Sequence, residues 1–93
     1  MISSVPIDWD ASPVIPAVVQ DASYLTVLMV GFMNRDAFDK TVTSGLVTFF
    51  SRSRNQLWTK GETSGNVLNV VELRINCEEN SLLVLANPVG PTC

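Results

Sequence analysis

Apolar residues recur along the chain in short blocks that have the length and composition of β-strands. Residues 14–20 and 25–32 form two such blocks, and the polar turn Asp21-Ala22-Ser23 between them predicts a hairpin. Pro16 lies inside the first block. Because proline has no N–H to donate to a neighbouring strand, we expect this block to form an edge strand at best.

One short helix is expected over residues 35–44. Asn34 is suited to the N-cap position, and Gly45 is placed to be the residue just past the C-terminal end, where a left-handed conformation is common. The helical spacing would turn three apolar side chains towards the core: Ala37, Phe38 and Val42.

The rest of the chain predicts further strands. They are expected at residues 46–54, 56–60, 67–75 and 82–86. Residues 61–66 form a loop with two glycines, residues 76–80 a polar turn, and residues 87–91, with two prolines, break regular structure. The fold class is therefore α+β and dominated by β-structure: a small folded or barrel-like sheet with one short helix, in a single domain over residues 1–93.

Composition adds an oligomeric state and a compartment. Only 16% of the residues are charged against 46% hydrophobic, which favours a homodimer that hides apolar surface. The net charge of −3 argues against nucleic-acid binding, which needs a basic face. No targeting segment is evident, and the apolar stretch 25–33 is too short to span a membrane. We expect a cytoplasmic protein whose two cysteines stay reduced.

Candidate chemistry gathers between residues 51 and 66. Three of the six cations, Arg52, Arg54 and Lys60, fall within nine residues. On an extended strand Arg52 and Arg54 would point the same way, and two guanidinium groups on one face match the oxygens of a phosphate. Spacing alone gives equal weight to a solvated hairpin with surface arginines.

The loop that follows adds further donors. Gly61 and Gly65 let the backbone approach a ligand closely, so that the N–H groups of the turn can bind an anion. Thr63 and Ser64 add two hydroxyls. Trp58 is suited either to stacking on a base or sugar or to plain packing. Glu62 fits a general base, a magnesium ligand or a solvated acid.

The run SRSRNQLWTKGETSGN, residues 51–66, resembles the signature of the phosphoribosyl-AMP cyclohydrolase family. The likeness extends through residues 29–34 and 82–93 and covers about residues 8–93. It resembles most closely the cyclohydrolase half of bifunctional enzymes that also carry a phosphoribosyl-ATP pyrophosphohydrolase domain, a second domain not found in this sequence.

The resemblance implies an enzyme of histidine biosynthesis that hydrolyses the N1–C6 bond of the purine ring of phosphoribosyl-AMP. It implies a zinc-activated water, whose pKa such a metal lowers to about 7. It assigns no catalytic side chain. The residues that it implies for substrate binding are Arg52, Arg54, Trp58, Lys60, Thr63 and Ser64.

The resemblance also implies two metals. In the family, three cysteines shared across a dimer interface bind zinc, and the first lies in an Asp-Cys-Asp-x-Asp segment whose aspartates bind magnesium. Here that segment reads Asn76-Cys77-Glu78-Glu79-Asn80. Cys77 and Cys93 match the first two zinc cysteines. The sequence contains no third cysteine and no histidine, so we expect a domain that lacks its C-terminal zinc-ligand segment.

An extended geometry would suit both metals at this segment. Asn76, Glu78 and Asn80 would share one face and offer oxygens to Mg²⁺, while Cys77 would offer a thiolate to Zn²⁺ on the other. Amides replace two of the three carboxylates, which removes most of the charge attraction for magnesium and leaves the site degraded. The alternative for the two cysteines is that they are buried small apolar residues.

Three hypotheses follow for the function. The first is an active metal-dependent cyclohydrolase that acts on a small nucleotide and belongs to a longer native chain. The second is an inactive remnant that dimerises and binds a nucleotide, and the third is an interaction domain with no ligand.

Overall fold

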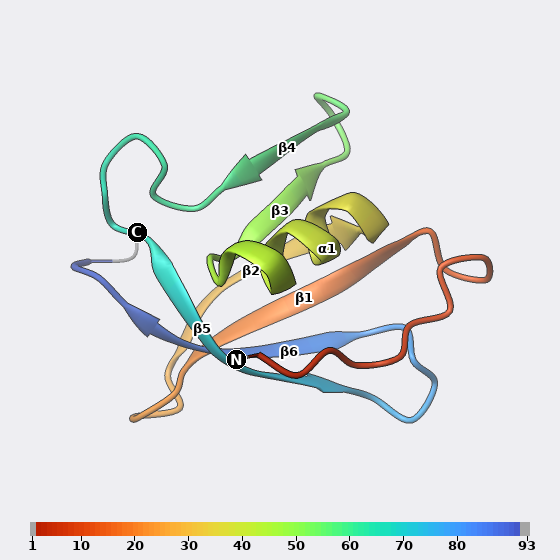
Figure 1. The fold of residues 1–93 in the computed structure, drawn as a ribbon, viewed down its shortest axis with the longest axis horizontal. Helices are drawn as coiled ribbons and strands as arrows, with labels where there is room; N and C mark the ends of the chain where they lie inside the picture. The colour runs from red at the N-terminus through yellow and green to blue at the C-terminus, as the bar shows by residue number, and fades with distance from the viewer. Residues whose placement is uncertain (1, 92–93) are drawn as a thin grey trace.

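The computed structural model describes residues 2–91. These residues form six strands and one helix (Figure 1). In chain order they are β1 (Val14–Asp21), β2 (Val27–Asn34), α1 (Arg35–Ser44), β3 (Thr48–Ser51), β4 (Gln56–Thr59), β5 (Leu68–Ile75) and β6 (Leu82–Pro88).

The strands form two separate sheets. Four of them lie in the order β2-β1-β6-β5, in which β1 and β6 run parallel and the two outer pairs are antiparallel. The other two, β3 and β4, form an antiparallel ribbon. A β-dominated α+β fold is confirmed, but a barrel-like sheet is wrong for the described residues. Within residues 2–91 the four-stranded sheet stays open. Strand β3 pairs with β4, and a single isolated bridge, Leu46 to Asn69, links the residues just before β3 to β5.

Pro16 does not place its strand at an edge, so that prediction is wrong. Strand β1 lies between β2 and β6. Pro16 is opposite Phe32 of β2, but the parallel ladder to β6 begins one residue later, at the pair Ala17 and Leu82. The proline is accommodated because its part of the strand has no β6 partner.

The helix is confirmed with both of its ends. The Asn34 side-chain oxygen accepts a hydrogen bond from the Ala37 N–H at 2.9 Å. Gly45 has φ 76°, and its N–H donates to the Thr41 carbonyl at 3.0 Å. Ala37 and Phe38 are buried as expected, whereas Val42 is partly buried against the core. A third buried position of the helix, Thr41, was not predicted.

Several strand boundaries differ from the prediction: β2 is shifted by two residues, from 25–32 to Val27–Asn34, and the C-terminal ends of β3 and β6 also move. Residues 52–55 form a turn, with Asn55 at φ 52°, so the strand expected over 46–54 ends at Ser51. Strand β6 continues to Pro88, which lies opposite Leu68, so the break expected over 87–91 begins later.

The core lies between the four-stranded sheet and a second layer made of α1 and the ribbon (Figure 1). Alternate residues of β1, Ile15, Ala17 and Val19, point into it. The core also takes Met33 from β2, Phe49 from β3, and Val84 and Ala86 from β6. The ribbon is therefore held firmly at its base while its turn reaches outwards. Among the described residues, no helix has the length and hydropathy to cross a bilayer.

Candidate functional site

Trp58 lies at the centre of the candidate site, on strand β4. It is opposite Phe49 of β3, and the two rings lie 5.1 Å apart, inclined by 35°. Phe49 is fully buried and Trp58 is half-buried. Trp58 therefore packs on one side and contributes to open surface on the other.

Two pockets meet at Trp58. The first, here called the aromatic pocket, has a volume of about 550 Å³, and the second, the polar pocket, about 480 Å³. Both volumes lie in the range typical of small-molecule sites. The aromatic pocket is lined by Gly31, Phe32, Phe49, Phe50, Ser51, Arg52, Ser53 and Trp58, and the polar pocket by Ser51, Arg54, Gln56, Trp58 and Glu62.

Arg52 and Arg54 lie on the turn between the strands, not on a strand. Arg52 lines the aromatic pocket and Arg54 the polar pocket. The argument that strand geometry turns both side chains to one face is therefore wrong. A turn lacks the two-residue alternation of a strand, and here it begins directly after Ser51, whose hydroxyl accepts from the Arg54 N–H at 3.4 Å.

Phe32 was not predicted as part of the site. The guanidinium carbon of Arg52 lies 3.8 Å from the centroid of the Phe32 ring. This distance is well within the range of a cation–π interaction. Phe32 belongs to β2, so only the packing of the ribbon against β2 brings it to Arg52, and no local sequence signal could have found the contact.

Gly31 lets the floor of the aromatic pocket form. A side chain at this position would collide with the Phe49 ring, because the ring lies directly on the Gly31 backbone. Phe49 thereby supports Trp58 from below. The resemblance covers the segment around Gly31 but implies no role for this glycine.

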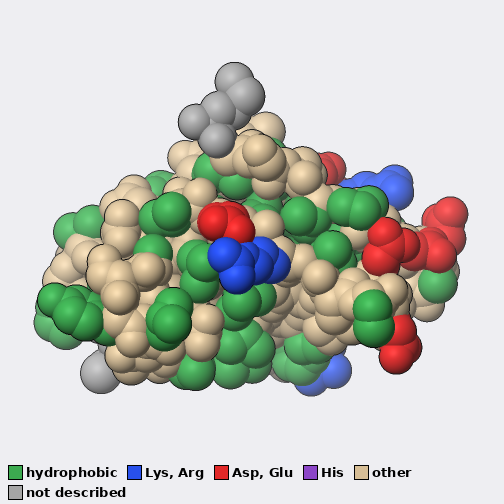
Figure 2. All heavy atoms as spheres, turned by 90° about the horizontal axis from the view of Figure 1, so that it is seen from below, with side chains coloured by type: hydrophobic (Ala, Val, Ile, Leu, Met, Phe, Trp, Pro, Cys, Tyr) green, Lys and Arg blue, Asp and Glu red, His purple; other side chains and the backbone are tan. Residues whose placement is uncertain are grey.

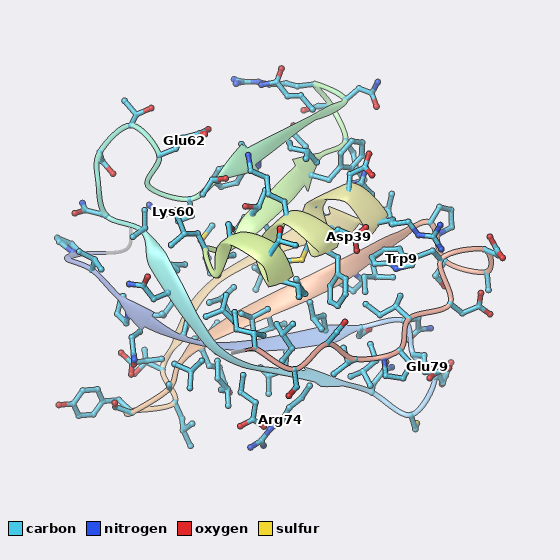
Figure 3. All side chains as sticks on the ribbon, viewed as in Figure 1. Trp9, Asp39, Lys60, Glu62, Arg74 and Glu79 are labelled. Atoms are coloured by element: carbon cyan, nitrogen blue, oxygen red, sulfur yellow. The ribbon has the colours of Figure 1, made fainter. Side chains whose placement is uncertain are left out.

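The loop after β4 brings a different set of side chains to the pockets than expected. Glu62 lines the polar pocket, whereas Lys60, Thr63 and Ser64 belong to neither pocket wall. Figure 3 shows Lys60 and Glu62 at the start of this loop. The Ser64 hydroxyl instead accepts a hydrogen bond from the Asn66 N–H at 3.2 Å within the loop.

This loop also contacts the C-terminal part of the described chain. A side chain added at Gly90 would meet the Asn66 amide oxygen at 2.6 Å, and the Val89 N–H donates to the Val67 carbonyl at 2.9 Å. The segment that leads towards Cys93 is thus tied to the loop. Cys93 itself lies outside the described residues.

Residues 76–80 form a tight turn, so the extended geometry expected there is wrong. The Asn76 side-chain oxygen accepts from the N–H groups of Asn80 and Ser81, each at 2.9 Å, and its amide nitrogen donates to the Asn80 oxygen at 2.7 Å. Both amides are thus engaged within the turn. Cys77 and Glu78 are exposed, so Cys77 is not the buried apolar residue of the alternative reading.

The donors of residues 2–91 do not complete a metal site. No group of three or more His, Cys, Asp or Glu side chains lies close enough in this part of the chain to hold an ion. The two amides proposed for magnesium stabilise the turn, and Cys77 offers a single sulfur. Four ligands are usual for structural zinc, and catalytic zinc keeps three from protein.

Comparisons with known proteins match most of the chain. A family model described as "Phosphoribosyl-AMP cyclohydrolase" matches residues 29–93. The "Histidine biosynthesis bifunctional protein HisIE" of Salmonella typhimurium is 59% identical over 88 residues, which are 94% of this chain and 43% of that protein. The proteins of the same name from Escherichia coli K12 and Bacteroides thetaiotaomicron are 57% and 52% identical over the same shares. The chain therefore spans less than half the length of these curated relatives.

Proposed function

The chain belongs to the phosphoribosyl-AMP cyclohydrolase family, and from this premise we propose that it takes part in histidine biosynthesis by opening the purine ring of phosphoribosyl-AMP. In this reaction the oxygen of a water bonds to C6 and the N1–C6 bond breaks. N1 keeps the electron pair and takes up one proton of the water. The other proton leaves the oxygen for the exocyclic nitrogen or for solvent, and C6 becomes the carbon of a carboxamide.

One observation supports the proposal above the others: two pockets with one arginine each adjoin at a tryptophan. A purine is flat and apolar on its faces, which suits the exposed side of Trp58. Phosphates suit guanidinium groups, which bind their oxygens through two parallel hydrogen bonds. These features support the binding and orientation of a phosphorylated nucleotide by the described residues.

For zinc, we propose Cys77 as one thiolate ligand and Cys93 as a second. Cys77 is exposed on its turn and therefore accessible to donors from elsewhere. Two ligands are too few for zinc, and this sequence has no histidine and no third cysteine, so at least one further donor, a carboxylate or a group from another molecule, is needed. We propose no magnesium at Asn76, Glu78 and Asn80, because the two amides are engaged within the turn.

A second candidate function follows from the incomplete donor set. A domain with an intact nucleotide pocket and too few metal ligands would bind nucleotide without turning it over. Absorbance assays with phosphoribosyl-AMP and added Zn²⁺, run beside metal analysis and calorimetry with AMP, separate the two. Turnover with bound zinc supports the cyclohydrolase, and binding without turnover supports the second candidate. If the protein shows no turnover and no binding, both candidates are refuted.

We further propose that a second copy of the chain covers the open face of the four-stranded sheet. Val30, Val18 and Leu83 are neighbours across β2, β1 and β6 on this face. Figure 3 shows Arg74 pointing to this side, away from α1, and Figure 2, seen from this side, shows a basic and an acidic group surrounded by hydrophobic side chains.

The charges on this face suit a symmetric partner. Arg74 Nε donates a hydrogen bond to Glu72 Oε2 at 2.6 Å. The pKa of Arg74 is raised mainly by this hydrogen bond and secondly by the negative charge of the carboxylate. In a two-fold dimer each copy can offer the same pair to the other. Analytical ultracentrifugation tests this: Val30→Lys should shift the protein to monomer, whereas Val89→Lys, an equally apolar exposed position outside the sheet, should not. An unchanged mass for Val30→Lys would contradict this interface.

A further inference from the structure

We propose that Arg52 and Arg54 bind two different phosphates of one substrate, one on each side of Trp58. The inference rests on the proposed function. Phosphoribosyl-AMP carries two ribose phosphates, attached through their sugars to two nitrogens of a single purine. One belongs to the AMP half and the other to the phosphoribosyl half, so the substrate has an anion at each end of a flat ring.

The arrangement of the pockets matches that layout. The aromatic and polar pockets share only Ser51 and Trp58 among their lining residues. Each has an arginine of its own from the same four-residue turn, Arg52 in one and Arg54 in the other. A ligand that crosses Trp58 would therefore place one end in each pocket.

The chemistry of the two pockets assigns the halves. The aromatic pocket has rings on both β2 and the ribbon, which suits the purine and the phosphate of the AMP half. The polar pocket offers the Gln56 amide and the Glu62 carboxylate beside Arg54. An amide and a carboxylate hydrogen-bond sugar hydroxyls, which suits the phosphoribosyl half.

Arg52 is already held in place for its role. The Phe32 ring lies under its guanidinium group at 3.8 Å, which leaves the edges of the planar group available to phosphate oxygens. Arg54 has a separate backbone anchor, the bond from its N–H to the Ser51 hydroxyl. The two side chains thus start from different supports and approach different pockets.

The test compares Arg52→Ala and Arg54→Ala with two ligands. AMP binding is measured by calorimetry, and affinity for phosphoribosyl-AMP is taken from KM where the protein turns it over and from calorimetry where it does not. Arg52→Ala should weaken both ligands by about ten-fold or more, the loss expected for a charged hydrogen bond to phosphate. Arg54→Ala should weaken phosphoribosyl-AMP by a similar factor and change AMP by less than about two-fold.

Arg35→Ala is the matched control, because Arg35 is an exposed arginine outside both pockets. It should leave both affinities unchanged. Equal losses of AMP affinity in the Arg52 and Arg54 variants would mean one shared phosphate and overturn the inference, as would unchanged phosphoribosyl-AMP affinity in either. A wild-type protein that binds neither ligand would refute the proposed function itself, a result distinct from these.

Discussion

A buried threonine, Thr41, joins the helix to the ribbon that carries both pockets. Its hydroxyl oxygen accepts a hydrogen bond from the Thr48 N–H at 3.0 Å, and its proton is donated to the Ala37 carbonyl at 2.8 Å. Thr41 and Thr48 are completely buried. Replacing Thr41 by valine keeps the shape of the side chain but leaves the Thr48 N–H without its partner, away from water.

The expected cost follows from that orphaned donor. A buried unsatisfied N–H destabilises a protein by about 1–3 kcal/mol, so we expect Thr41→Val to lower the free energy of unfolding by about 2 kcal/mol. Thr59→Val is the matched variant. It removes a hydroxyl that lies 2.9 Å from the Thr48 hydroxyl, but the latter can still donate to the Leu46 carbonyl at 3.3 Å. We expect a loss of only about 1 kcal/mol there.

Urea unfolding followed by tryptophan fluorescence measures the free energy of unfolding of both variants. The protein concentration is kept fixed, because dimerisation would shift the apparent stability. With an m-value of about 1 kcal/mol/M, Thr41→Val should lower the midpoint by about 2 M without changing m. Thr41→Ser, which keeps the hydroxyl, should cost about half as much through its lost methyl group. The reasoning is refuted if the serine variant is as unstable as the valine variant, or if Thr59→Val is the more damaging change.

Three further outcomes are expected. Phe32→Leu should weaken AMP binding by about two- to five-fold by removing the cation–π contact with Arg52, whereas Phe32→Tyr should not. If Phe32→Leu weakens AMP binding further in a protein that already carries Arg52→Ala, that mechanism is contradicted. Gly45→Ala should lower the free energy of unfolding by about 1 kcal/mol, because φ is 76° there; an unchanged urea midpoint would argue against the left-handed cap. Asn76→Ala should cost about 1–2 kcal/mol in the same assay by releasing two backbone N–H groups, and added Mg²⁺ should not stabilise the wild type more than the variant.

Local signals predicted the parts of the fold that depend on local forces. The helix has its N-cap at Asn34 and its left-handed glycine at Gly45, both within hydrogen-bond reach of the residues that they cap. The strand cores are also correct, because their apolar runs leave few other solutions. The prediction that Pro16 puts its strand at an edge was wrong, because the outcome depends on where β6, distant in the chain, begins to pair with β1.

The candidate site shows the same division. The arginines and Trp58 were identified as residue types suited to a phosphorylated nucleotide, and Arg52, Arg54 and Trp58 do line pockets. Their distribution between two pockets depends on the turn at residues 52–55. The sequence pattern predicted a strand through residue 54 and therefore no turn there. Arg52 and Phe32 are twenty residues apart in the sequence (52 − 32), so their contact follows from tertiary packing alone.

The parallel pairing of β1 with β6 has a consequence for how the protein can be made. Ala17 pairs with Leu82, so the centre of the sheet joins residues that are 65 positions apart, 82 − 17. During synthesis the first hairpin can form early, but its inner edge stays unpaired until β6 leaves the ribosome. Such long-range pairing slows folding and exposes an apolar strand to aggregation in the interval. A nascent chain stalled before residue 82 should therefore remain a substrate for chaperones rather than a partly working domain.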